Sequence, residues 1–236
     1  KLTYICQLVS GVFADVPQWA KAGMPLDDLF RQFKIKALTA GVDDVSYLVG
    51  SAGPDGYQDI IAPPNSRPLA AGDVFMLDTG CVWDGYFSDF DRNFAIHHAS
   101  DEAHETHHRL YDATQAAIDI LRPGVTAADL FFAMDAILRP DHQGSSQHEQ
   151  ISAVKTGDDG VGRYGHGLGT QLTEPPSHTN WDQTVITAGM TLTLEPSLCY
   201  GNGLTMVAEE NLLVLDDKLV LLSTRAPRDL PVIPSA

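Results

Sequence analysis

Residues 74–96 read VFMLDTGCVWDGYFSDFDRNFAI, and this stretch decides the fold. Asp84-Gly85 in its middle is a dipeptide that is typical of a two-residue hairpin turn. The runs on either side are rich in apolar, β-branched and aromatic residues, as strands are. The sequence therefore predicts an antiparallel hairpin with strands at Val74–Trp83 and Tyr86–Ile96.

A second hairpin of the same kind is predicted near the C-terminus. Segment 188–195 matches segment 71–78, and both are apolar runs that end in a carboxylate. Gly201-Asn202-Gly203 then supplies a turn between predicted strands at Thr191–Tyr200 and Leu204–Leu215. The chain thus contains two similar hairpins, one in each half.

The helical segments are duplicated as well. Segment 23–30 recurs as segment 124–131, and each copy reads as the start of a helix. In the second copy Thr126 is followed three residues later by Asp129, which resembles a capping box ahead of an apolar run. We expect a further helix before each start, at about 3–22 and 103–121, from the helical spacing of apolar residues.

Each half therefore reads helix, helix, strand hairpin. Helices and antiparallel hairpins that alternate in this way belong to the α+β class. We expect one internally duplicated domain over residues 1–236, in which two curved antiparallel sheets, related by a pseudo-two-fold, enclose a cleft and helices cover the outside.

The charge of the chain excludes several classes of function. Lysine and arginine number 15 against 31 aspartate and glutamate residues, which gives a net charge of −16. A field of this sign repels nucleic acids and anionic lipid surfaces. No apolar run is long enough to span a membrane, and the three cysteines, Cys6, Cys81 and Cys199, form no disulfide framework. These features favour a cytoplasmic protein.

The registers of the hairpins bring carboxylates together. If Tyr200 pairs with Leu204, Glu195 lies opposite Glu209. Directly opposed like charges destabilise a sheet unless a cation or a buried base lies between them. The turn of the first hairpin places Asp89 on the same face as Asp78, as its diagonal neighbour at about 7–8 Å.

Four acidic side chains from two duplicated hairpins indicate a metal site. Oxygen-rich ligation suits hard or borderline divalent ions such as Mn²⁺, Mg²⁺, Fe²⁺, Co²⁺ and Zn²⁺. A histidine is the expected fifth ligand, and His166 lies in the glycine-rich segment Tyr164–Gly169, where the backbone can approach an ion closely.

Across essentially the whole chain, these motifs resemble those of the pita-bread metallopeptidase family, which includes methionine aminopeptidase, aminopeptidase P and prolidase, with creatinase as a relative of the same fold. The matching motifs are Leu77-Asp78-Thr79-Gly80, Gly85-Tyr86-Phe87-Ser88-Asp89-Phe90-Asp91-Arg92, Gly165-His166-Gly167-Leu168-Gly169 with Glu174-Pro175-Pro176, Gly189-Met190 through Leu194-Glu195-Pro196, and Glu209-Glu210-Asn211. The glutamate motifs are closer to aminopeptidase P and prolidase than to methionine aminopeptidase.

The resemblance implies a pita-bread fold and a dinuclear site. The ligands implied for two divalent ions are Asp78, Asp89, His166, Glu195 and Glu209, with Asp89 and Glu209 bridging. Manganese is the favoured metal, with cobalt, zinc or iron as alternatives. Glu195 and His166 are the implied catalytic residues, with Glu195 as the base that takes the proton of a water molecule and passes it to the leaving nitrogen. The implied substrate is a short peptide with proline after the scissile bond.

The family branch usually carries an N-terminal domain before the catalytic one, and we expect this chain to correspond to the catalytic part alone. A homodimer is a further expectation from the resemblance.

The chain departs from the peptidase branch at two positions that face the substrate. Thr173 occupies the place of a histidine that contacts the substrate and the tetrahedral oxyanion, and the loop at 53–61 contains no histidine. Loss of one preorganised donor lowers the rate of hydrolases by about 10²–10³. We therefore consider Thr173 and His178 as substrate-binding candidates, with His178 as a substitute donor.

The departures leave two alternatives open. One is another metal-dependent reaction on the same scaffold, either hydrolysis of a non-peptide amide or a lyase reaction like that of dimethylsulfoniopropionate lyases. The other is a binding module without catalytic activity. The retention of all five metal positions argues against the second alternative.

Overall fold

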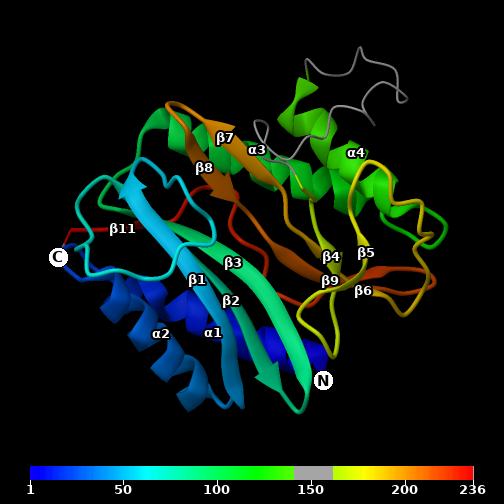
Figure 1. The fold of residues 1–236 in the computed structure, drawn as a ribbon, viewed down its shortest axis with the longest axis horizontal. Helices are drawn as coiled ribbons and strands as arrows, with labels where there is room; N and C mark the ends of the chain where they lie inside the picture. The colour runs from blue at the N-terminus through cyan, green and yellow to red at the C-terminus, as the bar shows by residue number, and fades with distance from the viewer. Residues whose placement is uncertain (141–161, 236) are drawn as a thin grey trace.

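The computed structural model describes residues 1–140 and 162–235 (Figure 1). Its helices and strands, in chain order, are α1 (Leu2–Trp19), α2 (Leu26–Ala40), β1 (Asp44–Pro54), β2 (Asp73–Trp83), β3 (Tyr86–Ile96), α3 (Asp101–Ile120), α4 (Ala127–Leu138), β4 (His166–Gly167), β5 (Glu174–Ser177), β6 (Thr191–Leu194), β7 (Ser197–Tyr200), β8 (Leu204–Val207), β9 (Glu210–Val214), β10 (Leu219–Leu221) and β11 (Val232–Ile233). The predicted helix–helix–hairpin order is present in both halves.

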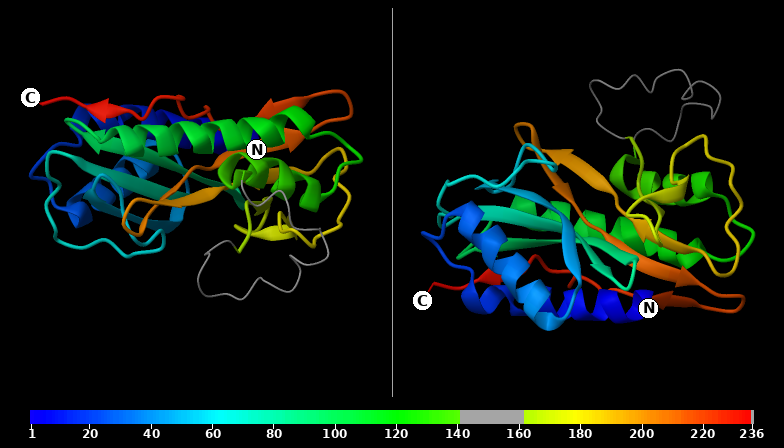
Figure 2. Two further views of the ribbon diagram at one scale, coloured as in Figure 1. Left: turned by 90° about the horizontal axis from the view of Figure 1, so that it is seen from above. Right: turned by 60° about the horizontal axis from the view of Figure 1, so that its bottom comes forward.

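The strands form two larger sheets and one ribbon. The first sheet has the order β1-β2-β3-β11, the second has the order β10-β9-β6-β4-β5, and β7 pairs with β8. Figure 2 shows α1 and α3 on the same side of these sheets. Within the described residues, no helix is both long and apolar enough to cross a membrane.

The first hairpin has the predicted register. Trp83 pairs with Tyr86, and Gly80 lies opposite Asp89. The two turn residues, Asp84 and Gly85, have φ angles of 48° and 77°, as a tight hairpin turn of the primed type requires. The local signal of the turn was therefore sufficient to fix the positions of the carboxylates on this hairpin.

The second hairpin also has the predicted register, but its strands are not continuous. Tyr200 pairs with Leu204, and further along Leu194 pairs with Glu210. Between these pairs the ladder is interrupted, so the expected strands Thr191–Tyr200 and Leu204–Leu215 are each divided in two. Pro196, which has no N–H to donate, lies at the interruption. Glu195 and Glu209 are therefore placed at the junction between two ladders.

Several strands were not predicted, and the longest of them is β1. This strand pairs antiparallel with β2 over almost its whole length. Its sequence DVSYLVGSAGP contains small residues that weaken the strand signal. Gly50 in this strand has a φ of 155°, and a Cβ atom there would lie 2.1 Å from the Met76 carbonyl oxygen, so only glycine allows the close approach of β1 to β2.

The structure has two hydrophobic clusters. One packs α1 and α2 against the first sheet, and the other combines α3 and α4 with the second sheet and with Val74, Met76 and Ala95 of the first sheet. The predicted capping box at the start of α4 is present, because the Thr126 side chain accepts from the Asp129 amide and the Asp129 side chain accepts from the Thr126 amide. The functional side chains lie where the two halves meet.

Candidate metal centre

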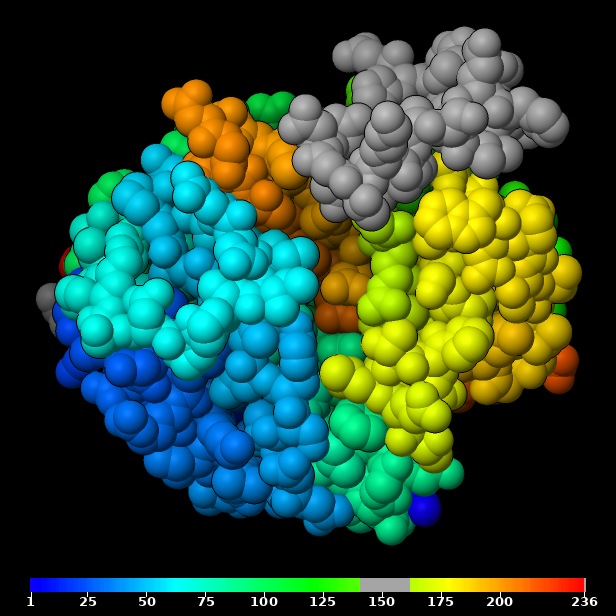
Figure 3. All heavy atoms as spheres, in the orientation of Figure 1, coloured from blue at the N-terminus to red at the C-terminus, as the bar shows by residue number. Residues whose placement is uncertain are grey.

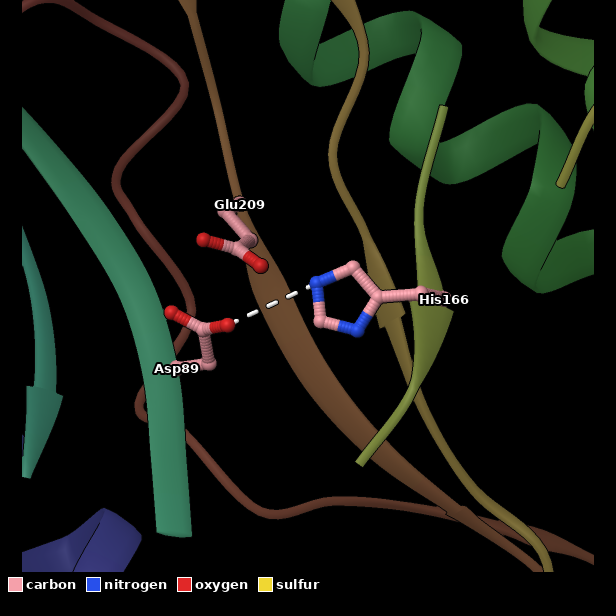
Figure 4. A group of neighbouring side chains, drawn as sticks. All are labelled: Asp89, His166 and Glu209. Atoms are coloured by element: carbon pink, nitrogen blue, oxygen red, sulfur yellow. Dashed lines mark ion pairs between the residues drawn. The ribbon is translucent and has the colours of Figure 1, made fainter. Parts of the chain in front are cut away.

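Three buried side chains from separate elements meet at one point (Figure 4). Asp89 comes from β3, His166 from β4, and Glu209 from the position just before β9. One nitrogen or oxygen atom of each lies within 4.8 Å of the others, and their exposed fractions are 5%, 2% and 2%. These residues form a compact set of one imidazole and two carboxylates, a combination that can bind a divalent ion.

The tautomer of His166 directs a lone pair towards the carboxylates. Its Nδ1 atom lies 2.8 Å from the Gly167 carbonyl oxygen, and because a carbonyl only accepts, Nδ1 carries the proton. Burial lowers the pKa of His166 to about 4, so the ring is neutral near pH 7. Its unprotonated Nε2 atom faces Asp89 Oδ2 at 3.4 Å and Glu195 Oε2 at 3.8 Å. Such a contact repels unless a cation or a proton lies between the atoms.

The other two predicted ligands complete the cluster. Glu195 directly follows β6, and its amide donates to the Tyr164 carbonyl at 3.0 Å, which holds it beside the segment that carries His166. Asp78 lies on β2 and shares a face with Asp89, as the register requires. The structure thus groups Asp89, His166 and Glu209, with Glu195 at 3.8 Å from His166 and Asp78 on the same face of the first hairpin as Asp89.

The carboxylates of the centre have raised pKa values, because they are buried and lie close to one another. Burial, together with the charge of Glu195, raises the pKa of Asp78 to about 8, and burial raises the pKa of Glu195 to about 7. Burial and neighbouring carboxylates also raise the pKa of Asp89 and of Glu209 well above their usual range. Without a cation, this part of the protein favours protonated acids.

Hydrogen bonds from neighbouring residues fix the backbone around the ligands. The Asn211 side chain accepts from the Asp89 amide at 3.0 Å and donates to the Asp89 carbonyl. The Thr193 hydroxyl accepts from the His166 amide at 3.1 Å. A Cβ atom at Gly165, whose φ is 133°, would lie 2.3 Å from the Thr193 carbonyl oxygen, so glycine is required for this approach.

The donor set fits a divalent metal. Asp78 Oδ1 and Glu209 Oε1 are buried and have no hydrogen-bond partner among the described residues. No described lysine or arginine nitrogen lies within 4.0 Å of the Asp78, Asp89, Glu195 or Glu209 carboxylates. Buried carboxylates are normally paired with cations or bound to metals. Oxygen atoms and one imidazole nitrogen, as found here, suit divalent ions of hard or borderline character.

A cavity of about 720 Å³ is lined by residues between 162 and 182, among them Arg163, Thr173, Thr179 and Trp181, and by none of the five predicted ligands. Figure 3 shows a hollow between the blue and cyan surface of the first half and the yellow-green segment after residue 162. This hollow lies between the two halves, whereas the 720 Å³ cavity is lined by residues of the second half alone. Thr173 is exposed and lies on the cavity wall, where its hydroxyl is 3.5 Å from Arg163 Nη2. The Thr173 side chain is therefore accessible from this cavity.

His178 lies in a different environment. Its ring is fully buried, at 0% exposed, and its Nε2 atom hydrogen bonds the Thr193 carbonyl oxygen at 3.1 Å. Burial and the proximity of His166 lower the pKa of His178 to about 4. This neutral, buried side chain supports the strand that carries Thr193 and does not face the cavity, so the structure gives no support to its selection as a substrate-binding residue.

Two residues near the centre were not selected from the sequence. Asp91 is 2% exposed and lies directly opposite Asp78 in the first hairpin. The predicted register implied this pairing, so a signal was present. Arg163 lies near enough to lower the pKa of Asp89 and of Glu195 by its positive charge. No local pattern in the sequence indicates that placement.

Comparison with known proteins identifies the family of the chain. The model of metallopeptidase family M24 matches residues 1–217. The chain belongs to metallopeptidase family M24. It is 26% identical over 227 residues to the probable dipeptidase PepE of Mycobacterium bovis, which covers 96% of this chain and 56% of that protein. It is 29% identical over 171 residues to the Xaa-Pro dipeptidase of Lactobacillus helveticus, which covers 72% of this chain and 43% of that protein.

Solved structures of M24 enzymes have the same fold. The crystal structure of dipeptidase PepE from Mycobacterium ulcerans superposes with a TM-score of 0.85 at 26% identity, over 99% of this chain and 59% of that one. The predicted α+β pita-bread fold is thereby confirmed. The chain spans about half the length of the curated M24 relatives named above. Members of the family bind divalent metals, which agrees with the buried Asp89, His166 and Glu209 cluster.

Proposed function

We propose that the chain is the catalytic part of a metal-dependent peptidase that cleaves short peptides, with Xaa-Pro dipeptides as the favoured substrates. The observation that carries this proposal is the geometry of His166, whose neutral Nε2 atom faces two carboxylates with no protein cation between them. The names of the relatives, dipeptidase and Xaa-Pro dipeptidase, support the choice of substrate.

The residues proposed to hold two divalent ions are Asp78, Asp89, His166, Glu195 and Glu209. Four carboxylates carry a charge of −4, which two divalent ions balance, so loading removes the repulsion that raises the carboxylate pKa values. Bound divalent ions in such a pair supply Lewis acidity, which lowers the pKa of water and polarises a carbonyl group. A site with four carboxylates favours manganese, while cobalt, zinc and iron are the alternatives.

Glu195 is the proposed general base. Its side chain is 25% exposed, whereas the Asp89 side chain is 8% exposed, so Glu195 is the more accessible of these two to water and substrate. Burial raises its pKa to about 7, which suits a group that accepts and returns a proton near neutral pH. We assign to Glu195 the removal of a proton from the attacking water and its delivery to the leaving nitrogen.

Arg163 is the proposed substrate-positioning residue of the cavity. Its guanidinium makes no ion pair within 4.0 Å with a described carboxylate, and its hydrogen bond to Thr173 is long at 3.5 Å. Once metals neutralise the four carboxylates, this guanidinium is an unmatched positive charge at the wall of the cavity. It is therefore available to bind a carboxylate or a carbonyl oxygen of a bound peptide.

The test is turnover of a panel of Xaa-Pro dipeptides and tripeptides by the manganese-loaded protein, with bound metal quantified in the same sample. The expected result is cleavage that is lost on chelation and restored by manganese. A protein that binds two ions but cleaves no peptide in the panel would contradict the peptidase proposal.

Thr173 supports one second candidate, a metal-dependent reaction on a non-peptide substrate. Its short hydroxyl side chain replaces the histidine that the sequence comparison with the peptidase branch led us to expect, and it lies on the cavity wall. A small amide or a sulfonium compound that is consumed by the loaded protein, in the absence of dipeptide cleavage, would favour this candidate. A protein without metal and without turnover would instead favour the binding module.

A further inference from the structure

Asp91 occupies a position in the first hairpin that faces the metal centre. In the register of β2 and β3 it lies directly opposite Asp78, and it is two residues from Asp89 on the same strand. Residues two apart on a strand project to the same face, so Asp89 and Asp91 share one side of the sheet. Opposed residues in an antiparallel pair have Cβ atoms about 4.5–5.5 Å apart. The carboxylate of Asp91 therefore lies beside that of Asp78.

The carboxylate of Asp91 has no strong partner in the protein. It is 2% exposed, and its one hydrogen bond among the described residues comes from Asn93 Nδ2 at 3.5 Å, the limit of such a bond. The same Asn93 nitrogen donates to the Val207 carbonyl at 2.6 Å, and the Asn93 oxygen accepts from the Tyr57 hydroxyl at 2.8 Å. The amide group of Asn93 is therefore committed to other partners.

The neighbouring arginine does not neutralise Asp91 either. The Arg92 guanidinium donates to Glu210 Oε2 at 3.0 Å and to the Glu209 carbonyl oxygen at 2.8 Å. Asp73 of the same hairpin shows what a satisfied buried aspartate looks like, because it is 1% exposed and accepts two hydrogen bonds of 2.8 Å from Arg67. Asp91 lacks any comparable cation among the described residues.

We propose that Asp91 is a fifth carboxylate of the metal centre and helps to hold a divalent ion beside Asp78, either as a direct ligand or through one water molecule. This inference rests on the metal centre of the preceding subsection. Five carboxylates carry −5 against +4 from two divalent ions, so the loaded centre keeps one negative charge. Additional oxygen donors and negative charge favour hard ions such as Mn²⁺ over Zn²⁺, which prefers fewer ligands with nitrogen and sulfur among them.

The alternative explanation is hydration from a neighbouring cavity. A cavity of about 220 Å³ is lined by Asp91 and Glu209 together with residues of α1 and α3, including Phe13 and His107. A water molecule in this cavity can satisfy the Asp91 carboxylate without any metal. The two explanations differ in whether replacement of Asp91 changes the affinity for metal.

The experiment measures Mn²⁺ and Zn²⁺ binding to the metal-free full chain by calorimetry, with no peptide present. The variants are Asp91→Asn, which keeps the shape and removes the charge, and Asp112→Asn as the matched control, because Asp112 pairs with Arg228 on the surface. We expect Asp91→Asn to weaken Mn²⁺ binding at one site by about tenfold to a hundredfold, with a smaller effect on Zn²⁺. Asp112→Asn should bind both ions like the parent chain.

A second readout separates metal binding from folding. The visible absorption spectrum of the Co²⁺-loaded protein reports the ligand set, and it should change in Asp91→Asn but not in Asp112→Asn. Unchanged Mn²⁺ affinity together with an unchanged cobalt spectrum would overturn the proposal in favour of hydration from the cavity. A parent chain that binds no divalent ion would instead refute the metal centre itself, and that outcome is visible before any variant is made.

Discussion

Glu209 and Glu210 are neighbours in the chain and are both buried, yet only Glu210 has a cation. Glu210 Oε2 accepts from Arg92 at 3.0 Å and from the Ser223 hydroxyl at 2.5 Å, and its other oxygen accepts from the Ala226 amide at 2.7 Å. Glu209 is 2% exposed, and its Oε1 atom has no partner among the described residues. Glu210 therefore pairs with Arg92, whereas Glu209, just before β9, lies in the group with Asp89 and His166.

This difference predicts opposite effects of two matched substitutions. Glu210→Gln should destabilise the fold by about 3–5 kcal/mol, because it leaves the buried Arg92 guanidinium without its carboxylate. Glu209→Gln should unfold at an equal or higher urea concentration than the parent chain when both are metal-free at pH 8, since it removes one of several mutually repelling acids. Urea denaturation in the presence of a chelator checks both variants. Equal destabilisation by the two would contradict the distinction.

The pH dependence of stability in the metal-free protein is a second prediction. Between pH 6.5 and 8, unfolded aspartate and glutamate are ionised, whereas Asp78 and Glu195, with pKa values of about 8 and 7, still retain protons in the folded state. The folded state therefore binds more protons, and the free energy of unfolding falls as pH rises, by about 1.4 kcal/mol per pH unit for each retained proton. The three histidines whose pKa values are lowered to about 4 act in the opposite direction near pH 6.5, where an unfolded histidine is about half protonated, and they contribute little near pH 8.

The measurement is chemical denaturation at several values between pH 6.5 and 8, with and without a saturating divalent ion. The loaded protein should not lose stability over this range, because metal affinity rises as the carboxylates lose their protons. If the stability of the metal-free protein rises towards pH 8, the pKa values of the carboxylates of the centre are not raised as described.

Replacement of the proposed base gives a third prediction. Glu195→Gln removes the group that accepts the proton of water while it keeps the size of the side chain. We expect kcat for an Xaa-Pro dipeptide to fall by about 10²–10⁴ with the fold retained, as circular dichroism would show. Glu105→Gln, on the exposed side of α3, is the control and should turn over at the parent rate. An unchanged rate in Glu195→Gln would remove this residue from the mechanism.

A fourth prediction concerns Arg163. If its guanidinium holds a carboxylate of the substrate, Arg163→Gln should raise KM for a dipeptide about tenfold or more and leave KM for the corresponding dipeptide amide nearly unchanged. If it stabilises developing charge instead, kcat should fall for both substrates. Arg228→Gln, whose side chain pairs with Asp112 on the surface, serves as the control. Identical kinetics in Arg163→Gln and the parent would exclude Arg163 from the site.

The sequence predicted the parts of this fold that local chemistry determines. Asp84-Gly85 fixed the register of the first hairpin, and the glycine-rich turn at 201–203 fixed the register of the second across the interruption at Pro196. The five predicted ligand positions followed from these turns and from the family resemblance. The same register already implied that Asp91 lies opposite Asp78, although the prediction considered only the diagonal neighbour.

Other features depend on contacts that no local pattern encodes. Strand β1 contains small residues that weaken its sequence signal. One of them, Gly50, is needed because it packs directly against the Met76 carbonyl of β2. His178 was considered as a substitute for the missing substrate-facing histidine, but its burial against Thr193 is a tertiary effect. The position of Arg163 relative to Asp89 and Glu195 likewise results from the packing of one half against the other.

The proposed ligands are divided between the two halves of the chain. Asp78 and Asp89 belong to the first half, and His166, Glu195 and Glu209 belong to the second, so neither half alone carries the complete proposed donor set. Divalent ions bound at this junction would contact both halves at once, so they would stabilise the chain against separation of its two halves.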